Sequence, residues 1–255
     1  MYLITAKEKD LEEHLEIAKK YHIGLEVDDF FEPAVYEDNA KVDQLIELYK
    51  ATGLMDKSTM HGAFYDVIPF SLDRSIRELS LQRMKQSMEI AKRLGVKAVV
   101  FHTNYEPALR NEQYTRRVIE KMVSSLELLL QEYSTLHIYL ENMLDDTPDI
   151  LEEISKRLSD YDNYGICLDW AHVNIYSVLR KEWIDRLSEW IRHLHVNDND
   201  ILTDAHLAVG CGKIDWMELK TYLQKNLHPD TIVIETGQPK DQIYSLEYLQ
   251  KLLNE

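Results

Sequence analysis

Histidines and carboxylates recur in this sequence at or just after the ends of short apolar runs, where they could bind a divalent metal ion. The set consists of His61, His102, Glu141, Asp169, His172, His195, Asp204, His206 and Glu235. Imidazole nitrogens and carboxylate oxygens are the usual protein ligands of such ions. A carboxylate that directly follows a buried apolar strand also needs a partner. One cation could provide that partner for several of these side chains at once.

The ligand types divide the set into two candidate sites. Glu141, Asp169, His195 and Glu235 form an oxygen-rich group that suits Mn²⁺, Mg²⁺ or Co²⁺, whereas additional imidazoles favour Zn²⁺. The remaining residues form a second metal site or contact substrate hydroxyls, and they are His61, His102, His172, Asp204 and His206. Each residue alone also has a structural interpretation. A histidine can be hydrogen-bonded in the core, and Asp169 with His172 can cap the following helix.

The segment HVNDNDILTDAHLAVGCGKIDW (195–216) carries three of these residues in one loop. Asp204 and His206 are two residues apart, so they can face the same way in an extended segment. We interpret Asp198 and Asp200 as solvated loop acids, and the glycines at 210 and 212 as a tight turn. The other histidines do not end apolar runs and are interpreted as surface or packing residues, namely His14, His22, His137, His193 and His228.

Eight short apolar runs would have to position these side chains. They are YLIT (2–5), GLEV (24–27), STMHGA (58–63), KAVVFH (97–102), HIYLE (137–141), GICLD (165–169), IRHLHV (191–196) and TIVIE (231–235). Segments with helical spacing of apolar residues separate most of them. Eight such units in 255 residues predict a single-domain α/β fold, the (β/α)₈ TIM barrel, over residues 1–255. An open doubly wound sheet is the alternative, but the first run leads into AKEKDLEEH, without a glycine-rich loop.

Composition limits the classes of function. The chain has 45 Asp and Glu against 29 Lys and Arg, a net charge of −16, which argues against a nucleic-acid backbone as partner. It has two cysteines, no signal peptide pattern and no apolar run long enough to span a membrane. We therefore predict a cytoplasmic protein that does not bind membranes.

The motifs resemble those of the xylose isomerase-like TIM-barrel superfamily, which includes sugar phosphate isomerases and epimerases and is related to endonuclease IV. The matching stretches are MHGAFYDVIP (60–69), VVFH (99–102), YLENM (139–143), GICLDWAH (165–172), HVNDND (195–200), DAHLAVGCGKIDW (204–216) and IVIETG (232–237). Such barrels place their active sites at the carboxyl ends of the strands.

The resemblance to ketose epimerases implies that Glu141, Asp169, His195 and Glu235 bind one divalent ion. Mn²⁺ and Zn²⁺ are the first candidates. The ion would polarise a sugar carbonyl and stabilise an enediolate, while Glu141 and Glu235 act as the acid and base. His172 resembles a histidine that contacts substrate oxygens. Ile201 stands where ketose 3-epimerases carry an arginine, which argues against a ketohexose 3-epimerase.

The resemblance to endonuclease IV implies the alternative, a zinc phosphodiesterase acting on abasic DNA, with all nine residues of the set holding three zinc ions. The stretch ENMLDDTPD departs from the ENTAGQG usual in that family, and the expected rim loops are acidic. We therefore predict a metal-dependent isomerase or epimerase that acts on a sugar or sugar phosphate. Phe64 and Trp170 could form an apolar wall for the sugar or simply pack within the barrel. Separately, pairing of the outer helices of two copies would give a homodimer.

Overall fold

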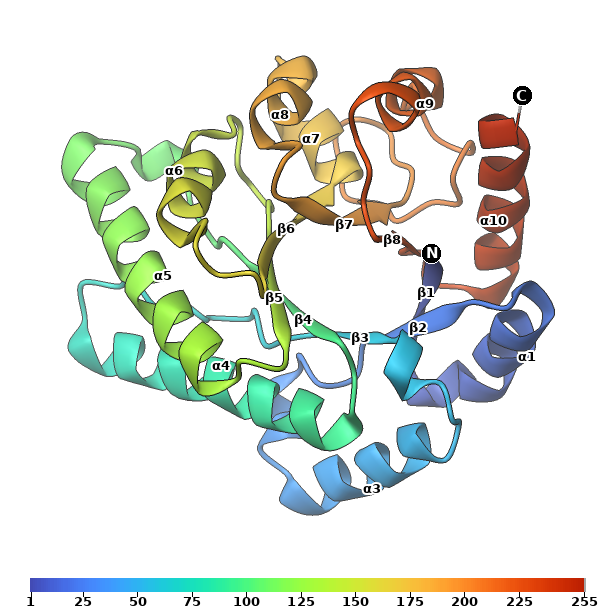
Figure 1. The fold of residues 1–255 in the computed structure, drawn as a ribbon, viewed down its shortest axis with the longest axis horizontal. Coiled ribbons are helices and arrows are strands. Elements are labelled where there is room, and N and C mark those ends of the chain that lie inside the picture. The colour runs from blue at the N-terminus through green and yellow to red at the C-terminus, as the bar shows by residue number, and fades with distance from the viewer. Residues whose placement is uncertain (255) are drawn as a thin grey trace.

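The computed structural model describes residues 1–254, and its eight strands form a closed parallel barrel (Figure 1). The strands are β1 (Tyr2–Ala6), β2 (Gly24–Val27), β3 (Thr59–His61), β4 (Ala98–His102), β5 (His137–Glu141), β6 (Tyr164–Asp169), β7 (Ile191–Val196) and β8 (Thr231–Ile234). Because β1 pairs with β8 as well as with β2, the open-sheet alternative is excluded. The predicted single-domain (β/α)₈ barrel is confirmed.

Helices surround the barrel (Figure 1). They are α1 (Leu11–Tyr21), α2 (Pro33–Tyr36), α3 (Asn39–Lys50), α4 (Arg74–Leu94), α5 (Glu112–Glu132), α6 (Asp149–Leu158), α7 (Trp170–Tyr176), α8 (Arg180–Leu187), α9 (Trp216–Lys225) and α10 (Pro239–Asn254). Short 3₁₀ turns lie at Glu8–Asp10, Met55–Lys57 and Pro107–Leu109. The side chains of Asp73, Asn111 and Asp215 accept hydrogen bonds from backbone N–H groups of α4, α5 and α9, which defines where those helices begin.

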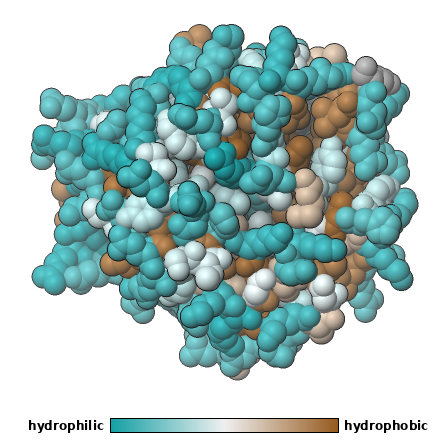
Figure 2. All heavy atoms as spheres, in the orientation of Figure 1, coloured by the Kyte–Doolittle hydropathy of each residue, from teal (hydrophilic) through white to brown (hydrophobic). Residues whose placement is uncertain are grey.

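The hydrophobic core lies mainly between the strands and the surrounding helices. A small separate cluster of Ala98, Val100, Tyr139 and Cys167 is also buried. Figure 2 shows a mostly hydrophilic surface on the face viewed in Figure 1, with apolar side chains scattered among the polar ones. None of the helices in residues 1–254 combines the length and apolarity needed to cross a membrane.

Strand register brings the functional side chains together. In the parallel ladders His102 is aligned with Glu141, and Asp169 is aligned with His195. Since parallel strands place their carboxyl ends at the same rim, residues that are distant in sequence become neighbours there.

Candidate metal centre

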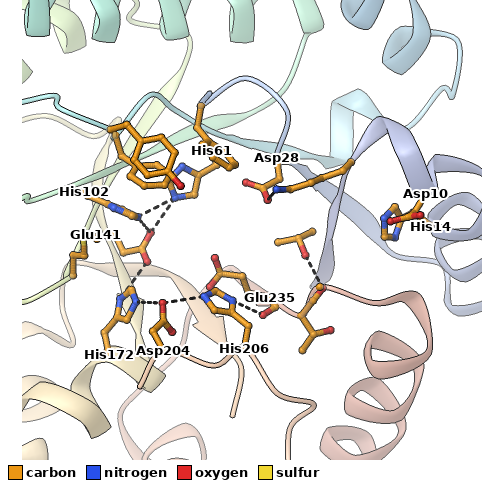
Figure 3. A pocket seen from close by; sticks show the side chains of 18 of the residues that line it. Asp10, His14, Asp28, His61, His102, Glu141, His172, Asp204, His206 and Glu235 are labelled. Atoms are coloured by element: carbon orange, nitrogen blue, oxygen red, sulfur yellow. Dashed lines mark hydrogen bonds and ion pairs between the residues drawn. The ribbon is translucent and has the colours of Figure 1, made fainter. Parts of the chain in front are cut away.

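The carboxyl ends of the strands surround a cavity of about 440 Å³. Its lining includes His61, Phe64, His102, Glu141, His172, Asp204, His206 and Glu235. Figure 3 shows these histidines and carboxylates converging from several strands and loops. A volume of this size suits a small-molecule ligand.

The oxygen-rich group predicted from the sequence comes together around His195. Ligand atoms of Glu141, Asp169 and His195 all lie within 4.8 Å of one another, and the three side chains are buried. The Nδ1 atom of His195 is 3.4 Å from Glu141 Oε1 and 3.4 Å from Glu235 Oε2. Four candidate ligands, at or just after the ends of four neighbouring strands, therefore face one small volume.

A second group lies on the other side of the same glutamate. The Nε2 atoms of His61 and His102 are 3.0 Å apart, and they lie 3.7 Å and 3.4 Å from Glu141 Oε2. The two carboxylate oxygens of Glu141 thus face different groups of nitrogen ligands. A carboxylate in this position can bridge two cations.

A third group is formed by His172, Asp204 and His206. Asp204 Oδ2 lies 3.4 Å from His172 Nε2 and 3.0 Å from His206 Nε2, so one carboxylate oxygen lies between two imidazoles (Figure 3). The structure therefore brings the predicted second set together as two groups, with Glu141 as a member of the first.

In four of these imidazoles, the ring nitrogen that points away from the cavity lies at hydrogen-bonding distance from an acceptor outside the cavity. The Nδ1–H groups of His61, His172 and His206 donate to the backbone carbonyls of Gly62, Asn142 and Glu235 at 3.0, 2.9 and 3.0 Å. His195 Nε2 lies 2.8 Å from Glu26 Oε1. Because these acceptors fix one proton on the ring nitrogen that faces away from the cavity, the other ring nitrogen can present a lone pair to a cation once its own proton has been lost, as in most metal-ligating histidines.

Several buried polar atoms at the centre have no hydrogen-bond partner among the described residues. They include Glu141 Oε2, Asp169 Oδ2 and His195 Nδ1. Each such atom carries a desolvation cost when it is unpaired. A divalent cation would satisfy these atoms together, so the donor set fits metal binding, with more imidazole around His61 and His102 than around Asp169.

Burial and mutual charge shift the acid–base properties of the metal-free site. Burial raises the pKa of Asp169 to about 7, against the attraction of His172. Burial disfavours the charged form of His206, yet the carboxylates of Glu235 and Asp204 raise its pKa to about 10. Burial likewise opposes the charged form of Glu141, yet His195 and His102 hold its pKa well below the usual range. Protonated imidazoles thus balance carboxylates, and a bound cation would replace those protons.

Glu26 is a residue that sequence reasoning missed. It is fully buried below the cavity and accepts a hydrogen bond from Thr59 Oγ1 at 2.7 Å. His193, expected to be a packing residue, is buried with its Nε2 atom 2.9 Å from Glu26 Oε2. The sequence does contain a sign of this role, a charged residue inside the apolar run GLEV. It was missed because Glu26 lies within the run and not at its end, where site residues were sought.

Two expectations need correction. Trp170 does not line the cavity, because its side chain is fully buried and packs against Tyr222, with 5.9 Å between ring centroids. Phe64 does line the cavity, beside the His102 ring at 4.6 Å between centroids. Asp198 is not a solvated loop acid.

Asp198 instead organises the loop that carries Asp204 and His206. It is 1% exposed and accepts hydrogen bonds from the backbone N–H groups of Gly210 and Ile214 and from the Trp216 indole, at 2.9, 3.2 and 2.8 Å. A Cβ on Gly212 would lie 2.2 Å from Asp198 Oδ1, so only glycine fits beside this carboxylate.

Known proteins share this architecture. A family model described as xylose isomerase-like TIM barrel matches residues 17–252. An uncharacterized protein of Methanocaldococcus jannaschii, MJ1311, is 30% identical over 205 residues, which cover 76% of this chain and 69% of that protein. A probable endonuclease 4 of Ureaplasma parvum is 24% identical over 201 residues, covering 70% of this chain and 65% of its own. A solved D-tagatose 3-epimerase-like protein is 26% identical, with a TM-score of 0.77 over 99% of this chain and 97% of that one.

Proposed function

Because this chain belongs to the xylose isomerase-like TIM-barrel family, we propose that it is a metal-dependent carbohydrate isomerase or epimerase. Its substrate is a sugar that carries a carbonyl group next to a C–H group. Glu141 and Glu235 transfer the proton of that C–H group. Asp169 and His195 complete the ligand set for a divalent ion, with Mn²⁺ or Zn²⁺ as first candidates and Mg²⁺ or Co²⁺ as alternatives.

The observation that carries this proposal is the position of the two glutamates around one point. Glu141 ends β5 and Glu235 follows β8, on different sides of the barrel (Figure 1), yet each has a carboxylate oxygen 3.4 Å from His195 Nδ1. A substrate carbon above this point would lie between two carboxylates. One can accept a proton from one face of that carbon, and the other can return a proton.

Other residues of the chain orient the substrate. When bound, a divalent ion supplies positive charge that makes a C–H group beside a carbonyl more acidic. His172 faces the cavity with its Nε2 atom and can bind a substrate oxygen. Phe64 is partly exposed in the cavity wall and offers an apolar surface to the C–H face of a sugar.

Phosphodiester hydrolysis is the second candidate function. The group of His172, Asp204 and His206 favours it, because a third cation there would help to activate water and bind a phosphate. The similarity to probable endonuclease 4 supports the same candidate. The net charge of −16 and a cavity of about 440 Å³ favour a small substrate over a DNA duplex.

The test combines metal analysis with isotope exchange. We expect purified protein to bind a transition metal, and to exchange the α-proton of a ketose with solvent deuterium. Glu141→Gln and Glu235→Gln should each abolish exchange, whereas Glu89→Gln, on the exposed face of α4, should not. Metal content is measured on each variant to separate lost chemistry from lost metal. Exchange that persists in both cavity variants would contradict the proposal, and robust incision of an abasic duplex would establish the second candidate.

A further inference from the structure

Asp28 is a cavity carboxylate that belongs to none of the ligand groups described above. It directly follows β2, and its backbone N–H group donates to the Ala6 carbonyl of β1 at 3.0 Å. Its side chain is 19% exposed and lines the same cavity as the candidate metal centre. Figure 3 shows it next to His61, and the charges that act on it include that of Glu235. The barrel backbone therefore holds Asp28 beside the place where the proposed proton transfer occurs.

The Asp28 carboxylate has free hydrogen-bonding capacity. Within residues 1–254 its side chain contacts a charged partner only at Lys7, whose Nζ atom lies 3.4 Å from Oδ2. This separation exceeds the roughly 2.7–2.9 Å of a charge-assisted hydrogen bond. The next residue, Asp29, is instead used by the fold, because it accepts hydrogen bonds from the Glu8 N–H group and the Tyr49 hydroxyl. Asp28 therefore keeps acceptor positions for a ligand in the cavity.

Other groups in the cavity wall are less suited to exchange protons with a substrate at the metal centre. Asp10 and His14 lie on the opposite side of the cavity from His102 and His172 (Figure 3). Burial lowers the pKa of His14, and its Nδ1 atom lies 3.0 Å from Gln242 Oε1. Of the cavity carboxylates outside the ligand groups, Asp28 is therefore the better placed.

The acid–base properties of Asp28 allow it to take up and to release a proton. In the metal-free site, burial raises its pKa to about 7, against the attraction of His61 and Lys7. The carboxylates of Glu235 and Glu26 also raise this pKa. A group that carries protons works best when its pKa lies near the working pH. Asp28 meets this condition near neutral pH.

Isomerisation and epimerisation of a sugar differ in one proton. Both begin when a carboxylate removes a proton from the carbon next to the carbonyl, so that the C–H electron pair forms a C=C bond and the carbonyl oxygen becomes an alkoxide. Epimerisation ends when the carbonyl re-forms and a proton returns to the other face of the same carbon. Isomerisation also moves a hydroxyl proton from one oxygen to the next. Because Glu141 and Glu235 handle the carbon-bound proton, isomerisation needs a further group between the two oxygens.

We propose that Asp28 carries this hydroxyl proton, and that the reaction interconverts a ketose and an aldose. This inference rests on the proposed function and adds the type of reaction. Asp28 takes the proton from the C1 hydroxyl, and the O–H electron pair forms the aldehyde C=O bond. The C=C electron pair then takes up a proton at C2 from the glutamate that is in its acid form. Asp28 gives its proton to the oxygen at C2, so the protons balance without a co-reactant.

The test measures the two kinds of proton transfer separately. Metal-loaded protein is incubated in D₂O with ketopentoses and ketohexoses, free and phosphorylated, and NMR quantifies deuterium at C1 of the ketose and the aldose formed. Since an amide cannot carry the proton, Asp28→Asn should form aldose about 100-fold more slowly, while deuterium incorporation at C1 stays within about threefold of wild type. Its affinity for the metal, measured by titration, should not change, because Asp28 lies outside the ligand groups.

Three further variants complete the test. Asp28→Glu keeps a carboxylate and should recover part of the aldose formation. Asp10→Asn removes another carboxylate of the same cavity and should leave the ratio of aldose to incorporated deuterium unchanged. Asp28→Ala replaces Asp28→Asn if the latter does not fold, and it should show the same fall in that ratio.

The outcomes distinguish the role of Asp28 from the proposed function. Equal losses of aldose formation and C1 exchange in the folded variant would overturn the role of Asp28. Wild-type protein that forms only an epimeric ketose, with deuterium at C3, would also overturn it but would leave proton transfer by Glu141 and Glu235 intact. Wild-type protein that exchanges no carbon-bound proton of any of these ketoses would contradict the proposed function and, with it, the role of Asp28.

Discussion

The carboxylate of Glu26 lies 2.8 Å from Nε2 of His195, on the side of the imidazole that faces away from Glu141 and Glu235. The same carboxylate accepts a hydrogen bond from Thr59 and lies 2.9 Å from His193 Nε2. Although burial opposes its charged form, the attraction of His195 and His193 holds the pKa of Glu26 well below its usual range. Glu26 therefore stays ionised and orients His195, with Nδ1 directed toward Glu141 and Glu235.

The first prediction tests this positioning role. Glu26→Gln should weaken binding of a transition metal by about 10- to 100-fold, because the residue behind a histidine ligand fixes its tautomer and orientation. Competition with a fluorescent chelator measures the affinity. Glu89→Gln, on the exposed face of α4, serves as the control. Unchanged metal affinity in a folded Glu26→Gln protein would show that Glu26 is only a packing residue.

The second prediction concerns Asp198. Asp198→Asn should lower the free energy of unfolding by about 1–3 kcal/mol, because one amide oxygen cannot replace two carboxylate oxygens that accept several buried N–H groups. Urea denaturation measures the change. Asp200→Asn, in the exposed part of the same loop, should have a smaller effect. Equal losses in the two variants would contradict the organising role of Asp198.

The fold and the gathering of histidines and carboxylates at one rim could be predicted from the sequence for the same reason. Strands of a closed parallel barrel are short apolar runs, and each run ends at a common rim, so a residue such as Glu141 or His195 is placed by its position at the end of a run. Glu26 could not be found in this way. Its carboxylate is in mid-strand, and its partners at 193 and 195 become neighbours only when the barrel closes.

Trp170 and Asp198 show a second limit of sequence reasoning. Trp170 directly follows Asp169, but it is the first residue of α7, and its side chain packs among the outer helices. Asp198 follows His195 in an acidic stretch, yet the chain folds back so that three N–H groups from residues 210–216 reach it. Both outcomes depend on the direction of a side chain, which composition and spacing do not determine.

The third prediction concerns pH. In the metal-free protein His206 is protonated at pH 7, because Glu235 and Asp204 raise its pKa to about 10 against the effect of burial. Metal binding through its Nε2 atom requires loss of that proton, so affinity should rise with pH, and binding should release protons at pH 7. Calorimetry in buffers of different ionisation enthalpy counts the protons released. His206→Asn should reduce the count, and a binding enthalpy that does not depend on the buffer would contradict this prediction.

The fourth prediction distinguishes the two candidate reactions through Asp204. Its carboxylate joins His172 to His206 but does not belong to the group around His195. For proton transfer between Glu141 and Glu235, Asp204→Asn should reduce the number of bound ions while lowering the rate of α-proton exchange by less than about tenfold, or about 1.4 kcal/mol in the barrier. Asp169→Asn, within the group around His195, should abolish exchange. If phosphodiester hydrolysis is the reaction, Asp204→Asn should instead abolish cleavage, because the third ion would then help to bind the phosphate and activate water.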